Sequence, residues 1–282
     1  MSVDGASITA DSSLNALLPA TIKSAGAIRM ASALPYAPWE YYNPPSSKNF
    51  AGFDFDLSRA ITAKLGVKDT FINTSFDSLI LSVLGGKNDM IMADMYDNST
   101  REKQISFVDY AYDGTSILVL KGNPAHLSNL ASLAGKTVTC LSGATQQLLL
   151  ESLNKQFKAQ GKPQMTILAF AGTPEGLLAM KGGRAVAQVT DHSQAESIGM
   201  STGGGNVYQV LSDPSAPHGY DPAIVGAGIA KNNTQLITAV QKALQALINE
   251  GSYQKIVAKY GLQPVSSALV NQGTATSASP TP

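Results

Sequence analysis

The stretch that decides the fold is Lys87–Asp109, KNDMIMADMYDNSTREKQISFVD. It contains an apolar run, Met90–Ala93, that ends abruptly in a cluster of polar side chains. A short apolar run between turn signals is typical of a strand buried in a parallel sheet. Because ligands of open α/β sheets bind just beyond the carboxyl ends of such strands, the polar cluster is expected to face a ligand. Its arginine, Arg101, is the natural anion receptor.

Composition narrows the class of protein. With 282 residues, 44% of them hydrophobic, the chain can bury one large core or two smaller ones. Twenty basic and twenty acidic residues give zero net charge, which argues against nucleic-acid binding. No apolar run approaches the roughly 18 to 20 residues of a membrane span, and the first residues lack the regions of a secretory signal. The single cysteine, Cys140, lies in an apolar run and is expected to be a buried, inert thiol.

Strands and helices are expected to alternate, which predicts a parallel α/β sheet. One helix begins after Gly52 and another ends before Gly251. Their predicted buried faces follow a helical repeat. These faces are Phe53, Leu57, Ala60, Ile61 and Leu65 in the first helix, and Leu236, Val240, Ala243, Leu244, Leu247 and Ile248 in the second.

An internal similarity suggests two related halves. Leu81–Asp94 and Leu177–Asp191 share an order of helix, Gly-Gly, basic residue, strand and aspartate. Aligning the two Gly-Gly pairs superposes Asp94 on Asp191 without a gap. Each aspartate could accept an ammonium group or cap the helix that follows, and a carboxylate can do both.

Other candidate residues also have two interpretations. Arg101 follows a possible capping box that starts at Ser99, so it could grip a carboxylate or pair with Asp97 or Glu102 on the surface. The loop after Leu141 places a glycine at a helix start, which is an anion site in outline. The aromatic residues could stack on a ligand or pack against the protein. They are Tyr36, Trp39, Tyr41, Tyr42 and Phe76.

Signatures of enzymes and cofactors are weak. Gly199–Gly203 matches G-x-S-x-G but follows a helical segment, whereas a nucleophile elbow needs a strand before it. His126, His192 and His218 have no metal-ligand spacing. The sequence has no P-loop and no dinucleotide-binding fingerprint. No metal and no cofactor are therefore expected.

Across residues 26–262 the sequence resembles the family 3 solute-binding proteins of polar amino acid ABC transporters. The resemblance is carried by seven motifs in the family's order. They are Tyr36–Trp39, Gly52–Leu57, Phe76–Ile80, Arg101 with Phe107–Tyr110, Gly143–Gln146, Gly182–Asp191, and Gly251–Tyr253 with Tyr260–Leu262.

This resemblance implies an α/β fold of the two-lobed, periplasmic-binding-protein-like type II, a clam shell. Each lobe would be a mostly parallel sheet flanked by helices, with two crossover hinge segments near Tyr112–Thr115 and His218–Pro222. The expected divisions are a flexible leader over 1–25, lobe 1 over 26–113 and 222–262, lobe 2 over 117–218, and a disordered tail over 263–282.

Roles of single residues are implied in the same way. Arg101 would bind a ligand α-carboxylate with help from Thr145, which follows Gly143 and Ala144 in the matching motif. Asp191 would bind the α-ammonium. Tyr36 and Phe76 match the family's aromatic clamp, with Trp39 close behind.

Three positions depart from the family pattern. Asp94 and Tyr96 stand where small residues are usual, and Ala144 stands where Ser or Thr is frequent. An extra carboxylate and an extra aromatic ring favour a basic amino acid, an amino-acid conjugate or a quaternary amine.

The expected function is that of a non-enzymatic, monomeric, extracytoplasmic binding protein that delivers its ligand to an ABC permease. It would lie in the periplasm or be lipid-anchored on the outer face of the cell membrane. One alternative is an enzyme like cyclohexadienyl dehydratase, with Asp94 or Glu40 as general acid. Another is a ligand-sensing domain.

Overall fold

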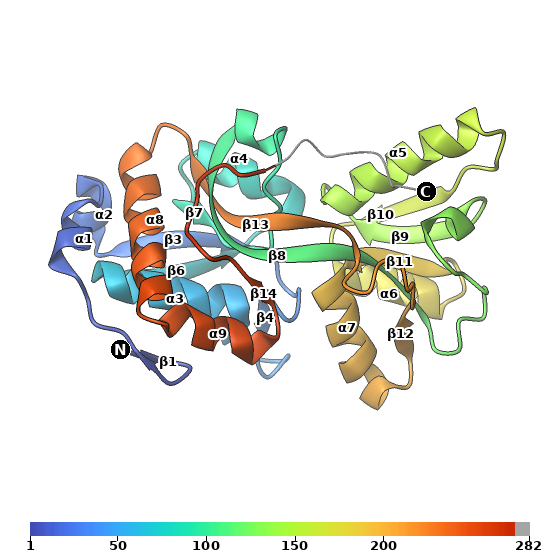
Figure 1. Cartoon of the computed structure of the whole chain (residues 1–282), viewed down its shortest axis with the longest axis horizontal. Coiled ribbons are helices and arrows are strands. Elements are labelled where there is room, and N and C mark those ends of the chain that lie inside the picture. Colours follow the sequence, from blue (N-terminus) through green and yellow to red (C-terminus); the bar gives the residue numbers. More distant parts are fainter. Residues whose placement is uncertain (274–282) are drawn as a thin grey trace. The chain divides into compact units, whose positions relative to one another are not determined.

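The computed structural model describes residues 1–273, and these fall into two compact units. Unit 1 comprises Met1–Leu34, Pro38–Tyr112 and the described residues from Ala223 onward, and unit 2 comprises Pro35–Ala37 and Asp113–Pro222. Each unit contains a sheet flanked by helices (Figure 1), as predicted for an α/β protein.

The sheet of unit 1 is mostly parallel. Strand β3 lies between β6 and β7 and runs parallel to both, with Met30 opposite Phe71 on one side and Met90 on the other. β13 pairs antiparallel with β7. The elements of this unit are β1 (Ser2–Val3), β2 (Ala6–Ser7), α1 (Ser12–Ala16), α2 (Ala20–Ala25), β3 (Ala27–Ser32), β4 (Tyr41–Tyr42), β5 (Phe50–Ala51), α3 (Phe53–Leu65), β6 (Lys68–Asn73), η1 (Phe76–Ser78), α4 (Leu79–Leu84), β7 (Met90–Ile91), η2 (Arg101–Lys103), part of β8 (Ile105–Leu120), part of β13 (Tyr220–Ala230), α8 (Thr234–Asn249), α9 (Ser252–Tyr260) and β14 (Gln263–Pro264).

The predicted buried faces of α3 and α8 are confirmed, and the two helices pack against each other. Apolar side chains at helical spacing form one stripe on each helix, and burial of these stripes stabilises the unit. Leu84, the last residue of α4, is 47% exposed.

Residues 1–25 are folded onto unit 1, which differs from the flexible leader expected from their composition. β1 and β2 form a hairpin, and Val3, Ile8, Leu18 and Ile22 are buried. Asn15 donates a hydrogen bond to the Leu65 carbonyl over 2.8 Å, which holds α1 at the end of α3. The leader is ordered because its few apolar side chains find partners on α3, α8 and α9, which a local pattern does not reveal.

The sheet of unit 2 has the strand order β10-β9-β11-β8, and β12 also pairs with β8. β9 is parallel to β10 and β11, whereas β11 and β12 are antiparallel to β8. The elements are part of β8, η3 (Leu130–Leu133), β9 (Thr137–Leu141), α5 (Thr145–Ala159), β10 (Thr166–Phe170), α6 (Thr173–Lys181), β11 (Ala187–Asp191), α7 (His192–Ser201), η4 (Thr202–Gly205), β12 (Tyr208–Val210) and part of β13.

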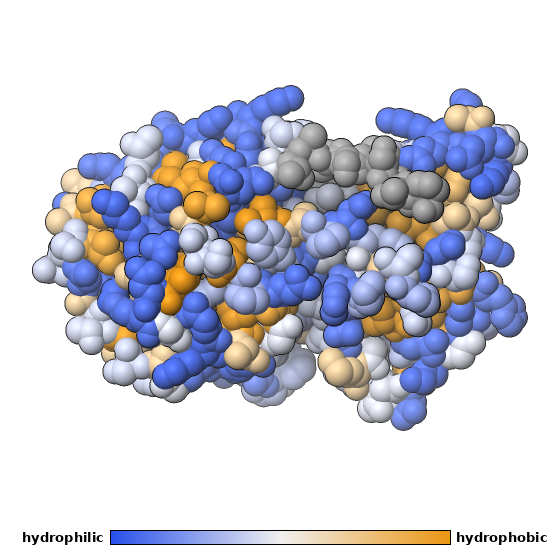
Figure 2. All heavy atoms as spheres, in the orientation of Figure 1, coloured by the Kyte–Doolittle hydropathy of each residue, from blue (hydrophilic) through white to orange (hydrophobic). Residues whose placement is uncertain are grey.

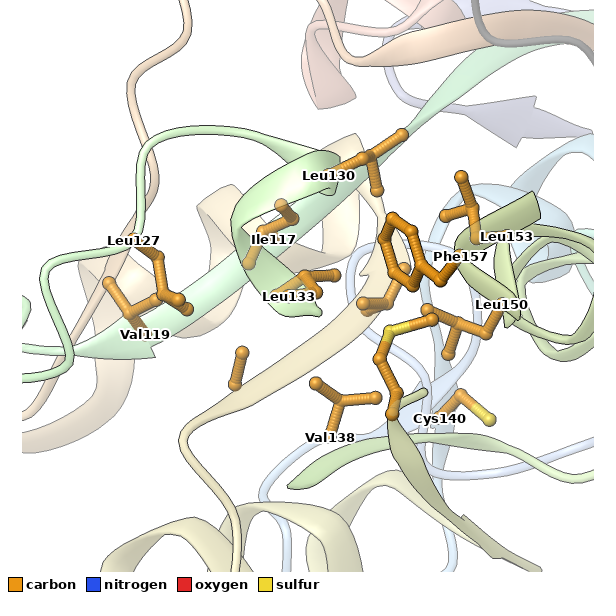
Figure 3. Packing of buried hydrophobic residues seen from close by; sticks show 13 residues of the cluster. Ile117, Val119, Leu127, Leu130, Leu133, Val138, Cys140, Leu150, Leu153 and Phe157 are labelled. Carbon is orange, nitrogen blue, oxygen red and sulfur yellow. The ribbon is translucent and has the colours of Figure 1, made fainter. Parts of the chain in front are cut away.

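Both faces of this second sheet are covered. Ile117 and Val119 of β8 pack with α5 residues such as Phe157 on one face (Figure 3). Leu118 points to the other face, where it packs with residues of α6 and α7. This alternation is the period of two that a strand requires. Cys140 lies in the first core, so its predicted burial is confirmed, and this burial raises the pKa of its thiol to about 12.

β8 and β13 each contain residues of both units, with divisions after Tyr112 and after Pro222. These positions fall within the two predicted crossover segments. Within unit 2 the two chain segments touch through their backbones, since a Cβ on Gly114 would lie 2.5 Å from the His218 carbonyl oxygen. Gly219 has a φ of 87°, so glycine suits this position for conformational reasons as well.

The tail expected to be disordered over 263–282 is ordered at least to Gly273. Gln263 and Pro264 pair with Tyr112 and Ala111 of β8, and Val270 bridges to Val108. The expectation was wrong for this part because its backbone partners lie on β8, far away in the sequence. Residues 274–282 lie outside the described residues.

The outer surface is mixed in character. On the face shown in Figure 2, hydrophilic and hydrophobic residues are interspersed. Within residues 1–273, every helix is too short or too polar to span a membrane.

Candidate ligand-binding site

In unit 1 the candidate site is built around Arg101, the first residue of η2. The side chain is buried, and its Nη1 donates a hydrogen bond to the Tyr96 carbonyl over 2.8 Å. The guanidinium carbon lies 5.5 Å from the ring centroid of Phe76, within cation–π range. Arg101 is therefore a buried cation with a hydrogen-bonded guanidinium, and not the surface arginine considered as an alternative.

The loop that carries Arg101 is anchored to β13. Tyr96 bridges to Val225, and the Asp97 N–H donates to the Ile224 carbonyl over 2.9 Å. The Asn98 side chain accepts hydrogen bonds from the N–H groups of Thr100 and Arg101, over 3.1 and 3.0 Å. The Asn98 side chain therefore supports the turn before η2, whose N-cap residue, Thr100, has no side-chain cap; the capping box predicted from Ser99 is not formed.

Asp94 begins this loop with an unusual backbone conformation. Its φ is 43°, in the left-handed region, and its N–H donates to Asp54 Oδ2 over 2.8 Å. Burial raises the pKa of Asp54 to about 6. β7 ends at Ile91, so Asp94 lies beyond the strand and its backbone turns the chain toward Arg101.

The aromatic candidates of unit 1 differ in their surroundings. Phe76 is buried beside Arg101, and its part in an aromatic clamp on the ligand stays a prediction. Trp39 is fully buried and packs edge-on against Phe53, with ring centroids 5.4 Å apart. Tyr41 and Tyr42 are half-buried in β4. Packing therefore accounts for Trp39, and its contact with a ligand stays a prediction.

In unit 2 the candidate site is built around Asp191, at the end of β11. Its carboxylate accepts hydrogen bonds from Gln146 Nε2, over 2.6 Å, and from the Tyr36 hydroxyl. Tyr36 also contacts Thr190 Oγ1 over 3.0 Å. Asp191 is the N-cap residue of α7, but its side chain makes no capping hydrogen bond to that helix, so the helix-cap interpretation is wrong for the carboxylate and its role as an ammonium acceptor stays a prediction.

The predicted anion site at a helix start coincides with the first turn of α5. Ala144 is the N-cap residue, and Thr145 opens a helix of 15 residues. Gly143 has a φ of 76°, and its N–H donates to Gln147 Oε1 over 2.9 Å. Among the described residues, Thr145 Oγ1 has no hydrogen-bond partner. This hydroxyl and the helix start can both serve an anionic group.

Two polar residues of unit 2 were not among the predicted site residues. Gln146 stood in a matching motif, but nothing there indicated that it would bind Asp191. Asp113 accepts hydrogen bonds from Ser193 and Gly114. Burial, followed by the charge of Asp191, raises the pKa of Asp113 to about 7. No sequence pattern indicated Asp113, because its neighbours are distant along the chain.

The predicted residues thus form two clusters, one in each unit. Unit 1 brings together Arg101, Tyr96 and Phe76, with Asp94 at the start of their loop. Unit 2 brings together Tyr36, Gln146 and Asp191. The first cluster offers a cation to an anionic group, and the second offers an anion and hydroxyl groups to an ammonium.

Known proteins share both the sequence and the fold. The lysine/arginine/ornithine-binding periplasmic protein of Escherichia coli is 29% identical over 234 residues, which cover 83% of this chain and 86% of the relative. An ancestral arginine-binding protein bound to arginine has a TM-score of 0.72 and 28% identity, and the match covers 83% of this chain and 98% of that one. An ancestral amino acid-binding protein described as a precursor of cyclohexadienyl dehydratase has a TM-score of 0.70 and 26% identity, covering 85% and 97%.

These likenesses confirm the predicted two-lobed type II fold. Residues 28–263, most of the chain, match the family described as bacterial extracellular solute-binding proteins, family 3. The chain belongs to that family.

Proposed function

We propose that this protein is the solute-binding component of an ABC importer and that it binds an amino acid or a related cationic amine. The observation that carries the proposal is the pair of buried, opposite charges, Arg101 in unit 1 and Asp191 in unit 2. An amino acid presents the complementary charges. Relatives named for lysine, arginine, ornithine and histidine support the same ligand class.

Each cluster has a proposed role in binding. Arg101 binds the α-carboxylate through a planar fork of donors that suits two carboxylate oxygens. The start of α5, with Thr145, adds donors to the same group. Asp191 binds the α-ammonium, and Gln146 and Tyr36 hold its carboxylate in place. Exclusion of water from these contacts strengthens them, because charges interact more strongly in a low-dielectric site.

We assign recognition of the ligand side chain to Asp94 and Tyr96. Both are buried near the start of the loop Asp94–Arg101, here called the arginine loop. A carboxylate with an aromatic neighbour suits a cationic side chain or a quaternary amine. We therefore propose basic amino acids as the first ligands to test, with amino-acid conjugates and quaternary amines next.

A thermal-shift screen tests the binding function. A ligand present at 100 times its dissociation constant should stabilise the protein by about 2.7 kcal/mol. The screen should include lysine, arginine, ornithine, histidine, polyamines and quaternary amines. Arg101→Met should abolish stabilisation by amino acids, whereas Arg184→Met, at an exposed arginine, should preserve it. Full stabilisation of Arg101→Met would contradict the proposal.

We propose that the protein is not an enzyme, that it acts as a monomer with a membrane permease, and that it is periplasmic or lipid-anchored. The relative described as a precursor of cyclohexadienyl dehydratase is itself described as an amino acid-binding protein, which supports binding without turnover. Incubation with prephenate and arogenate tests this point. Product formation that depends on Asp94 or Glu40 would overturn it.

A further inference from the structure

The segment Gln263–Gly273, here called the strap, follows α9 and runs alongside β8 (dark red in Figure 1). The family match ends at residue 263, so nearly all of the strap lies outside the part shared with the family. Its role is therefore not given by family membership.

Hydrogen bonds fix the strap along its length. The Asp109 N–H donates to the Leu269 carbonyl over 3.0 Å, and the Phe107 N–H donates to Asn271 Oδ1 over 2.8 Å. Nearer α9, the Val265 N–H donates to the Tyr253 hydroxyl over 2.9 Å, and Ala268 is held by the side chains of Gln241 and Gln245. The strap is thus an additional edge of unit 1.

The end of the strap lies on the loop that carries Arg101. The Gly273 N–H donates to Asp97 Oδ2 over 2.9 Å and to Glu102 Oε1 over 3.0 Å. The Gln272 N–H donates to Asp109 Oδ2 over 3.2 Å. Two of these three carboxyl groups therefore come from residues that flank Arg101 in the sequence.

The backbone of Gly273 lies very close to the backbone of Asp97 and Asn98. A Cβ built on Gly273 would lie 2.6 Å from the Asn98 nitrogen and from the Asp97 carbonyl carbon. A side chain at this position would therefore displace either the strap or the loop. Only glycine permits the observed contact.

The strap also bears on the electrostatics of the loop. Burial and the repulsion between the carboxyl groups raise the pKa of Asp97 to about 7 and that of Asp109 to about 8. The strap's N–H groups act in the opposite direction, since they favour the ionised carboxylates. Without these donors the carboxyl groups would lose hydrogen bonds while remaining beside one another.

Two residues on either side of Asp97, Tyr96 and Asn98, connect the strap's contact with Asp97 to Arg101. Asn98 holds the backbone N–H of Arg101, and the Tyr96 carbonyl holds its guanidinium. The residue between them, Asp97, is bonded to β13 through its N–H and to the strap through its carboxylate. We propose that Gly273 of the strap is a positioning residue that holds the arginine loop in its ligand-binding geometry. This inference rests on the proposed role of Arg101 as receptor for the ligand carboxylate.

The test compares Gly273→Val with Gln272→Ala in the full chain. Gly273→Val introduces the clashing Cβ, whereas Gln272→Ala removes an exposed side chain and keeps both backbone N–H groups. We expect Gly273→Val to weaken amino acid binding by about 10-fold, roughly the value of one hydrogen bond to a charged group. Amide hydrogen exchange over residues 96–101 should become faster in the ligand-free variant, and Gln272→Ala should match the wild type in both measurements.

A second variant, Gly273→Ala, gives the same comparison with a smaller clash in case the valine variant does not fold. Different outcomes would contradict the positioning role of Gly273 and the proposed binding function. If the wild type bound an amino acid and both Gly273 variants bound it equally well with unchanged exchange, only the positioning role would be wrong. If the wild type bound no amino acid, the proposed function would be wrong and this inference with it.

Discussion

In the two halves that share the Gly-Gly pattern, the aligned leucines have similar surroundings, whereas the aligned aspartates do not. Leu81 and Leu178, which align in the two halves, are both exposed, at 69% and 63%. The aligned aspartates differ. Asp191 ends a five-residue strand with its carboxylate bonded to Gln146 and Tyr36. Asp94 lies beyond a two-residue strand, in a left-handed conformation, with its N–H bonded to Asp54.

The same Gly-Gly, strand and aspartate pattern therefore leads to two different local structures. In unit 2 the strand continues to the aspartate, so the carboxylate is presented at the strand end. In unit 1 the strand stops early, and the aspartate's backbone starts the loop that carries Arg101. The proposed ammonium acceptor, Asp191, thus occupies the same position of the repeated pattern as Asp94, which begins the loop that carries the proposed carboxylate receptor, Arg101.

The largest effect is expected at Asp191. Asp191→Asn should weaken binding of any amino acid by about 100-fold, because the ammonium loses its buried counter-charge. The matched variant Asp94→Asn should weaken binding less, since its backbone contact with Asp54 is kept. Isothermal titration calorimetry measures both affinities.

A control distinguishes lost binding from lost folding. The ligand-free Asp191→Asn protein should melt at the wild-type temperature or above, because buried Asp113 no longer faces a charged neighbour. Equal losses of ligand affinity in Asp191→Asn and Asp94→Asn would contradict the different roles proposed for these two aspartates.

A smaller and more selective effect is expected at Asp94. Asp94→Ala should weaken binding of cationic ligands by about 10-fold and leave neutral amino acids nearly unchanged, if its carboxylate faces the ligand side chain. Competition between arginine and glutamine for the variant and the wild type gives the ratio directly. An unchanged affinity for cationic ligands would remove Asp94 from the ligand-binding residues.

The smallest effect concerns stability and pH. The pKa of Asp54 is raised from 3.8 to about 6 in the folded protein. Between these values the folded state holds more protons than the unfolded chain, so the free energy of unfolding should fall as the pH rises through this range. Asp54→Asn should flatten this dependence, as measured by urea unfolding at several pH values.

A second variant, at Asp109, tests whether the pH dependence can be assigned to single carboxyl groups. Asp109→Asn should change the slope up to about pH 8 instead, because the pKa of Asp109 is raised to about 8. A wild-type slope in the Asp54→Asn variant would show that Asp54 is not the titrating group.

Local patterns predicted the parts of the fold that depend on neighbours along the chain. The buried faces of α3 and α8 follow from residue spacing alone, and so does the strand that contains Cys140. The leader and the strap could not be predicted in this way. Each is ordered by partners that lie far away in the sequence, such as Leu65 for Asn15 and Phe107 for Asn271.

The candidate site shows the same limit. Arg101, Phe76 and Asp191 were predicted by motif, and all three are buried, with a cation–π contact between Arg101 and Phe76 and a hydrogen bond from Gln146 to Asp191. Their supporting residues were missed. Asp54 lies in a matching motif and Asp113 in a predicted crossover segment, but neither pattern indicated that Asp54 would accept a hydrogen bond from the Asp94 N–H or that Asp113 would lie near Asp191.

The discontinuity of unit 1 has a consequence for synthesis. Asp113–Pro222 of unit 2 leaves the ribosome as one uninterrupted segment, whereas unit 1 still lacks β13, α8 and α9 at that moment. Domains tend to fold as units during synthesis, so we expect most of unit 2 to fold while unit 1 is incomplete. The strap is made after all of these elements. The hydrogen bonds from the strap to Asp97 and Glu102 can therefore form only after α8 and α9 have been made, so we expect the loop that carries Arg101 to reach its described geometry later than most of unit 2.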